Sequence, residues 1–299
     1  MRRGIVLAVL LAFGALVAAK AQQPAANAPK VIDVEKVRDN LFVFRGANGG
    51  GNVAVFLTAG GVTVVDAKNP GWGKPILDKI KELTPKPVTM LINTHTHGDH
   101  VSGNVEFPAT VEVIAQANTK INMEKMPIFK EHNGMGLPKK TFTNTMTIGK
   151  GADRIDLYYF GRGHTNGDAF VVFRALRIAH AGDIFASKSV PLIDDANGGS
   201  MLHISETLMK AYNGINNVDT IINGHTPAQT KWADLKEYSE FNKDLVIWMQ
   251  AELKAGKTPE DAAKEWKLPE KYKGYSPTPG TNFGGLPARI KTLEAEMKK

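Results

Sequence analysis

Hydrophobic residues in this chain gather in short runs, and several of these runs end in polar loops. Residues 53–57 and 62–66 are almost wholly apolar, as strands covered on both faces are, and 59–61 joins them as a hairpin turn. Between 72 and 83 apolar residues recur every three to four positions, which predicts an amphipathic helix that ends before Pro85. Because strand and helix patterns alternate in this way, we expect a central sheet with helices outside it.

Four later strand-like runs end in loops that carry histidine or aspartate. The first run, 88–92, is followed directly by 93–100, which places three histidines and one aspartate within six positions. The other runs are 155–160, 177–181 and 218–222, and their loops carry His164, Asp183 and His225. Nitrogen and oxygen donors of this kind are what zinc-like cations prefer. We therefore interpret 93–100 as half of a metal site, with the other half in the later loops.

The spacing within 93–100 suits two ions better than one. His95 and His97 are two positions apart, so in an extended segment they project to the same side and can bind one ion. Asp99 and His100 are neighbours and cannot both point in that direction. The later loops can complete two sets, with the Asp183 carboxylate able to bridge them: His95, His97 and His164 for one ion, and Asp99, His100 and His225 for the other.

Two divalent ions a few ångströms apart lower the pKa of a water held between them and make hydroxide available near neutral pH. Such a site needs no serine or cysteine nucleophile. Asp99 is the best candidate for a catalytic residue that passes a proton to the leaving group. An explanation without metal would require several independent coincidences along the chain.

The N-terminus has the pattern of a secretory signal peptide. Two arginines precede the apolar run 5–19, and residues 19–21 fit a small-x-small cleavage site. We expect a signal peptide over 1–21, a disordered leader over 22–30 and a single domain over 31–299, located in the periplasm or secreted. No later segment approaches the roughly 18 uninterrupted apolar residues of a membrane span, so no stable membrane insertion is expected.

The overall charge changes little in this interpretation. The chain has 37 Lys and Arg against 30 Asp and Glu, and loss of Arg2, Arg3 and Lys20 with the signal peptide reduces the formal charge from +7 to +4. No basic stripe is visible, so we expect a small-molecule substrate and no nucleic acid. The absence of cysteine excludes disulfides and thiolate ligands. The oligomeric state is not predicted.

The ordered set of His and Asp residues resembles that of the metallo-β-lactamase superfamily over nearly the whole mature chain. It consists of Asp66, His95-x-His97-x-Asp99-His100, His164, Asp183 and His225. The resemblance implies an α/β fold, a four-layer αβ/βα sandwich of two halves, which we expect to meet near Phe160. It also implies a dinuclear zinc site at the edge of the two sheets, two ions per chain, with Fe or Mn possible for the same donors.

In that resemblance each residue of the set has a role. The first ion would be bound by His95, His97 and His164, the second by Asp99, His100 and His225, with Asp183 as the bridge and Asp66 as a supporting residue. Dinuclear metallo-β-lactamases commonly carry Cys or Ser where Asp183 falls, whereas glyoxalase-II-like thioesterases and lactonases carry the bridging aspartate. Asp183 thus points away from a dedicated β-lactamase.

The leading hypothesis is an exported dinuclear zinc-dependent hydrolase that uses a metal-bound hydroxide to cleave an ester, lactone or amide, with β-lactam hydrolysis as a main or side activity. The segment 191–200 also resembles that of exported hydrolases of the superfamily whose natural substrates are poorly defined. Alternatives are an iron-dependent oxidoreductase on the same fold, a dedicated β-lactamase, and a binding protein with a vestigial site. Candidate substrate-binding residues after the bridging aspartate are Ser187, Lys188 and Ser200.

Overall fold

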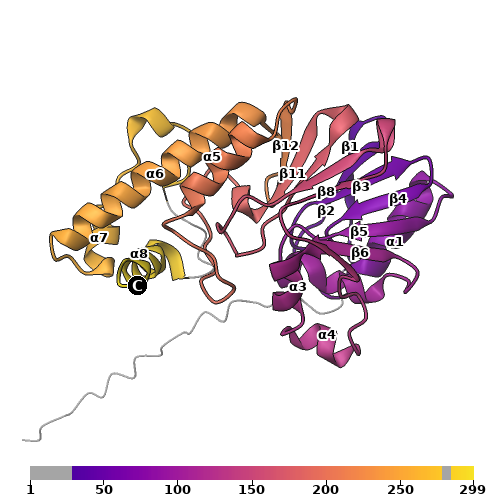
Figure 1. The fold of residues 1–299 in the computed structure, drawn as a ribbon, viewed down its shortest axis with the longest axis horizontal. Helices are drawn as coiled ribbons and strands as arrows, with labels where there is room; N and C mark the ends of the chain where they lie inside the picture. The colour runs from indigo at the N-terminus through magenta and orange to yellow at the C-terminus, as the bar shows by residue number, and fades with distance from the viewer. Residues whose placement is uncertain (1–28, 278–283) are drawn as a thin grey trace, which may run out of the picture.

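Two β-sheets form the centre of the protein, as Figure 1 shows. The computed structural model describes residues 29–277 and 284–299, so the expected signal peptide and most of the expected leader lie outside the described residues. The first sheet has the strand order β1-β2-β3-β4-β5-β6-β7, and the second has the order β13-β12-β11-β10-β9-β8. Strands β4 to β7 run parallel, as do β11 and β12, while the remaining pairs are antiparallel.

The strands of the first sheet are β1 Asp33–Arg38, β2 Leu41–Arg45, β3 Val53–Thr58, β4 Gly61–Val65, β5 Val88–Ile92, β6 Glu112–Gln116 and β7 Lys140–Phe142. Those of the second are β8 Thr145–Ile148, β9 Ile155–Tyr158, β10 Phe170–Phe173, β11 Ile178–Gly182, β12 Thr220–Asn223 and β13 Thr230–Lys231. The α-helices are α1 Gly73–Leu83, α2 Gly98–Val101, α3 Ala117–Met123, α4 Pro127–Glu131, α5 Ile204–Gly214, α6 Trp232–Lys254, α7 Pro259–Glu265 and α8 Gly285–Met297. Short 3₁₀ helices are η1 Ser102–Glu106, η2 Gly151–Asp153, η3 Arg174–Leu176, η4 Asp183–Phe185 and η5 Glu270–Tyr272.

The apolar strands are covered on both faces, as their sequence predicts. In β10, Val171 and Phe173 face the core between the two sheets, whereas Phe170 and Val172 face the core beneath the helices. Successive side chains of a strand point to opposite faces. A strand that is covered on both faces therefore needs apolar residues at every position. The continuous apolar runs in the sequence follow from this burial.

The layers form an α/β/β/α sandwich, which confirms the predicted fold class. One apolar core lies between the sheets, a second lies between the first sheet and α1, and a third lies between the second sheet and the later helices. Figure 1 shows α5, α6, α7 and α8 on the far side of the second sheet from the first. Among the long helices of the described residues, only α1 covers the outer face of the first sheet, where Ile76 and Ile80 are buried.

The chain passes from one sheet to the other earlier than its sequence suggests. Strand β7 ends at Phe142 in the first sheet, and β8 begins at Thr145 in the second, so the halves meet at 143–144 and not near Phe160. Strand β8 has four residues, of which Thr145 and Thr147 are exposed. So short and half-exposed a strand carries a weak hydrophobic signal, and its pairing with β9 depends on the tertiary fold.

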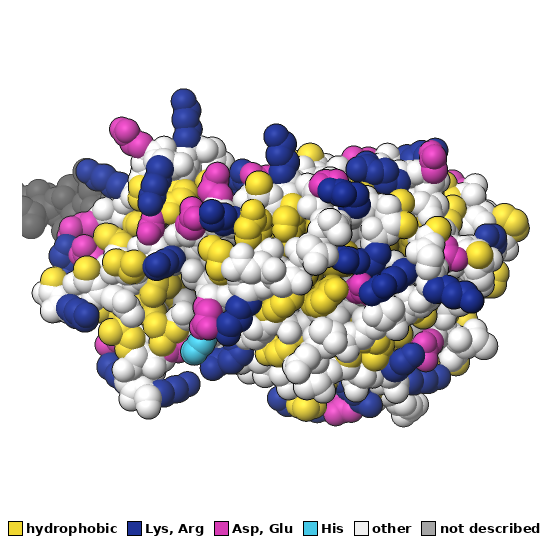
Figure 2. Space-filling view, turned by 45° about the horizontal axis from the view of Figure 1, so that its top comes forward, with side chains coloured by type: hydrophobic (Ala, Val, Ile, Leu, Met, Phe, Trp, Pro, Cys, Tyr) yellow, Lys and Arg dark blue, Asp and Glu magenta, His cyan; other side chains and the backbone are white. Residues whose placement is uncertain are grey.

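The surface view fits the mixed charge of the sequence. On the face drawn in Figure 2, Lys and Arg side chains are scattered, with Asp and Glu among them and apolar side chains between. Within the described residues, no helix combines the length and apolar character that crossing a membrane requires.

The packing between the sheets can be tested at Phe173, whose ring centroid lies 5.1 Å from that of Phe56. We expect Phe173→Ala to lower the free energy of unfolding by about 3–5 kcal/mol, because it removes a buried ring and leaves a cavity. Urea denaturation measures the change. Ile247→Ala, at a site 53% exposed on α6, is the control and should cost less than about 0.5 kcal/mol. Equal losses at both sites would contradict the packed layer.

Candidate metal centre

The seven candidate ligands come together where strand-end loops of the two sheets meet. The loop after β5 and the start of α2 carry four of them, and the loops after β9, β11 and β12 carry the others. We call His95, His97 and His164 the first group and Asp99, His100 and His225 the second group; Asp183 lies between them. The ligands of each group thus come from both halves of the chain.

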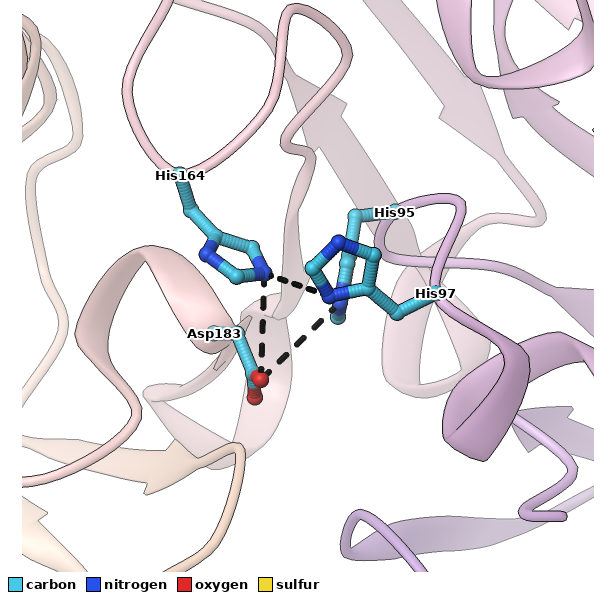
Figure 3. A group of neighbouring side chains, drawn as sticks. All are labelled: His95, His97, His164 and Asp183. Atoms are coloured by element: carbon cyan, nitrogen blue, oxygen red, sulfur yellow. Dashed lines mark hydrogen bonds and ion pairs between the residues drawn. The ribbon is translucent and has the colours of Figure 1, made fainter. Parts of the chain in front are cut away.

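The ligand atoms of the first group and of Asp183 lie close enough together to bind one metal ion. One ligand atom from each of these four residues lies within 4.8 Å of all the others. Figure 3 shows the three imidazole rings directed toward one another and toward the Asp183 carboxylate. His164 Nε2 lies 2.9 Å from His97 Nδ1 and 3.8 Å from Asp183 Oδ2, and His95 Nε2 lies 4.0 Å from the same oxygen.

The second group is equally compact and touches the same aspartate. His225 Nε2 lies 3.2 Å from Asp99 Oδ2 and 3.3 Å from His100 Nε2. Asp183 Oδ2 lies 3.1 Å from His225 Nε2, and Asp183 Oδ1 lies 3.3 Å from His100 Nε2. The Asp183 carboxylate therefore reaches both groups, as a bridging ligand must.

The chemistry of these side chains fits a bound cation. His95 Nε2 and Asp183 Oδ1 are buried and form no hydrogen bond, and the Asp183 oxygen has His100 Nε2 3.3 Å away. A buried polar atom without a partner costs free energy, and a cation that accepts electron pairs from both atoms would satisfy them. Imidazole nitrogens and carboxylate oxygens are ligands for zinc and also suit iron or manganese.

Hydrogen bonds to the outer ring nitrogens orient the histidines. His100 Nδ1 donates to Asp66 Oδ2 at 2.8 Å, and Asp66 also accepts from the backbone N–H and hydroxyl of Thr94. His164 Nδ1 donates to the backbone oxygen of Leu192 at 2.8 Å. These bonds leave His100 Nε2 and His164 Nε2 directed into the candidate site, an arrangement that is usual for metal-binding histidines. Asp66 thus links the backbone at Thr94 to the ring of His100.

His97 is oriented by a residue that the sequence did not single out. Its Nε2 lies 2.7 Å from Asp194 Oδ2, so its Nδ1 faces His164 and the first group. Asp194 is held in turn by the backbone N–H and side-chain amide of Asn197. The only sequence signal was a pair of aspartates at 194–195 in a loop after the bridging residue.

Without an ion, the two groups differ in charge. Burial, with the charge of neighbouring histidines, lowers the pKa of His95 well below its ordinary range and the pKa of His164 to about 3. In the second group burial also acts to lower the pKa of His225, but Asp183 and Asp99 outweigh it and raise that pKa to about 9. At neutral pH His95 and His164 are therefore neutral, whereas His225 carries a proton.

The carboxylates have the same effect on His100. Burial opposes its protonation, yet Asp183, Asp99 and Asp66 raise the pKa of His100 well above its ordinary value. Conversely, burial favours the neutral form of Asp99, but His100 and His225 lower the pKa of Asp99 to about 2. The second group thus holds protonated histidines beside ionised carboxylates, and a cation that binds there must displace the histidine protons.

A cavity of about 690 Å³ opens beside both groups. It is lined by Asn48, Gly50, Asn69, His97, Asp99, Asp183, Ala186, Ser187, Ser189, Leu192 and His225. Ser187, a predicted substrate-binding residue, is among the residues that line this cavity. Asp99 lies on the same wall, beside the metal ligands.

The other two residues proposed to bind substrate are held away from this cavity. Lys188 Nζ donates to Asp234 Oδ1 at 2.9 Å and lies 5.6 Å from the Tyr275 ring centroid. Ser200 is buried and its hydroxyl lies 2.8 Å from His203 Nδ1. Neither lines the cavity, because the segment after Asp183 turns their side chains toward α6 and the start of α5.

A buried lysine supports residues 46–51, a glycine-rich loop that lies over the second group. Lys68 has no exposed surface and donates to the Gly51 backbone oxygen at 2.7 Å, while Gly51 N–H donates to the Asp99 backbone oxygen at 3.0 Å. Burial, with the charge of Arg45, lowers the pKa of Lys68 to about 8. A Cβ at Gly51 would lie 2.1 Å from His100 Cε1, so only glycine fits this close approach. Sequence reasoning missed Lys68, because nothing local marks a lysine as buried.

Comparison with known proteins agrees with this fold and site. The sequence model of the Metallo-beta-lactamase superfamily matches residues 46–247, which is more than half of the chain. The chain therefore belongs to the metallo-β-lactamase superfamily. Its members are typically metal-dependent hydrolases, and this chain is a hydrolase of that superfamily.

Individual relatives are distant. A metallo-beta-lactamase type 2 from Elizabethkingia meningoseptica is 26% identical over 237 residues, covering 75% of this chain and 88% of the relative. A solved metallo-beta-lactamase from Pontibacter korlensis has a TM-score of 0.59 and 19% identity, covering 71% of this chain and 99% of the other. A variant of the sec-alkyl sulfatase PisA1 has a TM-score of 0.69 and 14% identity. The match covers 89% of this chain and 50% of the sulfatase chain. The two structural similarities support the fold.

The charge difference between the groups predicts unequal proton release on metal binding. At pH 7 zinc binding to the second group should release protons from His100 and His225, whereas His95 and His164 of the first group are neutral and have no such proton to give up. Affinity for the second ion should therefore increase as the pH rises toward 9, the approximate pKa of His225. Calorimetric titration in buffers of different ionisation enthalpy counts these protons. Equal release from both groups would contradict the assignment.

Proposed function

We propose that this protein is an exported dinuclear zinc hydrolase that cleaves an ester, lactone or amide bond. The observation that carries the proposal is the Asp183 carboxylate, which touches both ligand groups through its two oxygens. Zinc fits the nitrogen and oxygen donors, and the superfamily is typically zinc-dependent. No feature of the described residues favours the iron-dependent oxidoreductase.

Zinc ions bound to the two groups would supply a nucleophile from water near neutral pH and positive charge beside the oxygen of the scissile carbonyl. The chain's own contribution to proton transfer falls to Asp99, which lines the cavity and lies 3.2 Å from His225. The Asp99 carboxylate can accept a proton from the attacking water. It can then return that proton to the departing alkoxide or amine, so that the reaction consumes one water.

The lining of the cavity favours a substrate that is electrically neutral. Apart from the candidate metal ligands His97, Asp99, Asp183 and His225, its side chains are neutral: Asn48, Asn69, Ala186, Ser187, Ser189 and Leu192. Lys188, the nearest candidate partner in sequence for a substrate carboxylate, is engaged by Asp234. We therefore propose neutral esters and lactones as the preferred substrates. The amides of Asn48 and Asn69 and the hydroxyls of Ser187 and Ser189 would bind their polar groups, and Leu192 would contact an apolar part.

β-Lactam hydrolysis is the second candidate, as a main or side activity. It is supported by the type 2 metallo-beta-lactamases from Elizabethkingia meningoseptica and Bacillus cereus, which are 26% and 22% identical to this chain. Penicillins and cephalosporins carry a carboxylate, for which the described cavity lining offers no Lys or Arg. We therefore expect β-lactams to be cleaved more slowly than neutral esters and lactones.

The proposed location is the periplasm or the outside of the cell. Its support is the N-terminal sequence pattern, in which two arginines precede an apolar run and a small-x-small motif. Sequencing the N-terminus of the protein recovered from the periplasm of an expressing bacterium tests it. A mature chain that begins near Gln22 is expected.

A substrate panel on zinc-loaded protein tests the proposed reaction. The panel contains an aryl ester, an acyl lactone, a thioester, a cephalosporin and a phosphodiester. We expect the ester or lactone to give the highest kcat/KM, and Asp99→Asn to reduce it by roughly 10²–10⁴-fold, because that change removes a proton carrier and a ligand oxygen charge.

Asp39→Asn is the matched control. Asp39 is an exposed carboxylate in the turn between β1 and β2, where it pairs with Lys36 on the surface. Its replacement should leave every rate unchanged. No hydrolysis of any substrate above that in a zinc-containing buffer, or full activity of Asp99→Asn, would overturn the proposed function.

A further inference from the structure

The C-terminal part of the chain extends beyond the family match. That match ends at residue 247 within α6, so the end of α6, all of α7 and all of α8 lie outside it. These helices bury apolar side chains against the second sheet's outer core, including Leu286, Ile290 and Leu293 of α8. They also reach the segment 188–202, which connects the bridging aspartate region to α5.

Three polar contacts attach this C-terminal part to that segment. Arg289 of α8 donates its Nε to the Pro191 backbone oxygen at 2.8 Å. The Ser276 backbone N–H donates to the Lys188 backbone oxygen at 2.8 Å. Glu296 at the end of α8 accepts the backbone N–H of Leu202 at 2.9 Å.

Arg289 is the most deeply buried of these groups, with 1% of its surface exposed. Burying a guanidinium costs several kcal/mol unless its donors are used, so an arginine at such a site is expected to fix whatever accepts its hydrogen bonds. Here one acceptor is the peptide oxygen of Pro191. Asp194 and Asp195 also attract its charge.

The segment that Arg289 holds is the one that orients two ligands of the first group. Leu192, the next residue after Pro191, accepts the hydrogen bond of His164 Nδ1 through its backbone oxygen. Two residues further, Asp194 Oδ2 lies 2.7 Å from His97 Nε2, and the Asp194 backbone N–H donates to the His164 backbone oxygen at 2.9 Å. The chain from Pro191 to Asp194 therefore determines which ring nitrogen of each histidine faces the site.

We propose that Arg289 is a positioning residue for the first metal group, acting through the segment 191–194. It holds Pro191 so that Leu192 and Asp194 keep His164 and His97 in their metal-facing orientations. The C-terminal helices are then part of the metal centre, although they contribute no ligand to it. The inference rests on the proposed zinc site.

The second group has different support. His100 is held by Asp66, and the glycine-rich loop over it is held by Lys68, both from the segment after β4. Loss of Arg289 should therefore affect the two groups unequally. This asymmetry separates a positioning role from general destabilisation, which would weaken both.

The test compares Arg289→Met with Lys291→Met, a control on the same helix whose ammonium pairs with Glu260 at the surface. Zinc affinities of both groups are measured by competition with a chelator, and the ring N–H signals of His97 and His164 by NMR. Arg289→Met should weaken first-group zinc binding by about 10–100-fold, the range seen for loss of outer-shell partners, and shift both N–H signals. Second-group binding, and both affinities of Lys291→Met, should stay within about threefold of the parent.

A double-mutant cycle with Asp194→Asn tests the route. If Arg289 acts through 191–194, the double variant should bind zinc at the first group almost as well as whichever single variant binds it less tightly. If the two substitutions act independently, their fold-losses in affinity should multiply. Should Arg289→Met not fold, Arg289→Lys keeps the charge with fewer donors and should give a smaller loss confined to the first group.

The outcomes separate this inference from the proposed function. Parent protein that binds no zinc would overturn the proposed function and this inference with it. Parent protein that binds two zinc ions, with Arg289→Met binding them as tightly, or with both groups weakened equally, would overturn the role of Arg289 alone.

Discussion

The buried carboxylate of Asp183 is the constraint on which the rest of the site depends. It is 5% exposed, and the Nε2 atoms of His95, His100, His164 and His225 lie 3.1–4.0 Å from its oxygens. A negative charge buried to this extent must be compensated by positive charge. Without an ion, protons on His100 and His225 provide that charge. Were ions held by both groups, this carboxylate would be within reach of each, so one residue serves both groups.

The sandwich brings candidate ligands from its two halves together around this carboxylate. The first sheet supplies His95, His97, Asp99 and His100, and the second supplies His164, Asp183 and His225. Neither half alone completes a group. The apolar core between the sheets, in which Phe56 and Phe173 pack, therefore sets the spacing of the ligands as well as the stability of the fold.

The ligand set could be predicted because its signals are local. His95 and His97 are spaced for one ion, and each later ligand follows an apolar run that proved to be a strand. The alternation of such runs with helical patterns predicted a sheet with helices outside it, and the family resemblance implied the four-layer sandwich. These features depend on neighbouring residues, so the sequence displays them directly.

The surrounding residues could not be predicted, because their roles depend on tertiary contacts. Lys68, Asp194 and Arg289 look like ordinary surface residues in the sequence, yet they lie under the glycine-rich loop, behind His97 and beneath 191–194. For Lys188 and Ser200, by contrast, the sequence suggested a role at the site and the structure places their side chains away from the cavity. Their position after Asp183 suggested substrate binding, but Asp234 and His203 hold them elsewhere.

Anomalous X-ray diffraction from zinc-loaded crystals, recorded on both sides of the zinc absorption edge, tests the shared role of Asp183 most directly. The account predicts two zinc peaks per chain with the Asp183 carboxylate between them. One peak should lie among His95, His97 and His164, and the other among Asp99, His100 and His225. A single peak, or a second zinc ion that Asp183 does not contact, would contradict it.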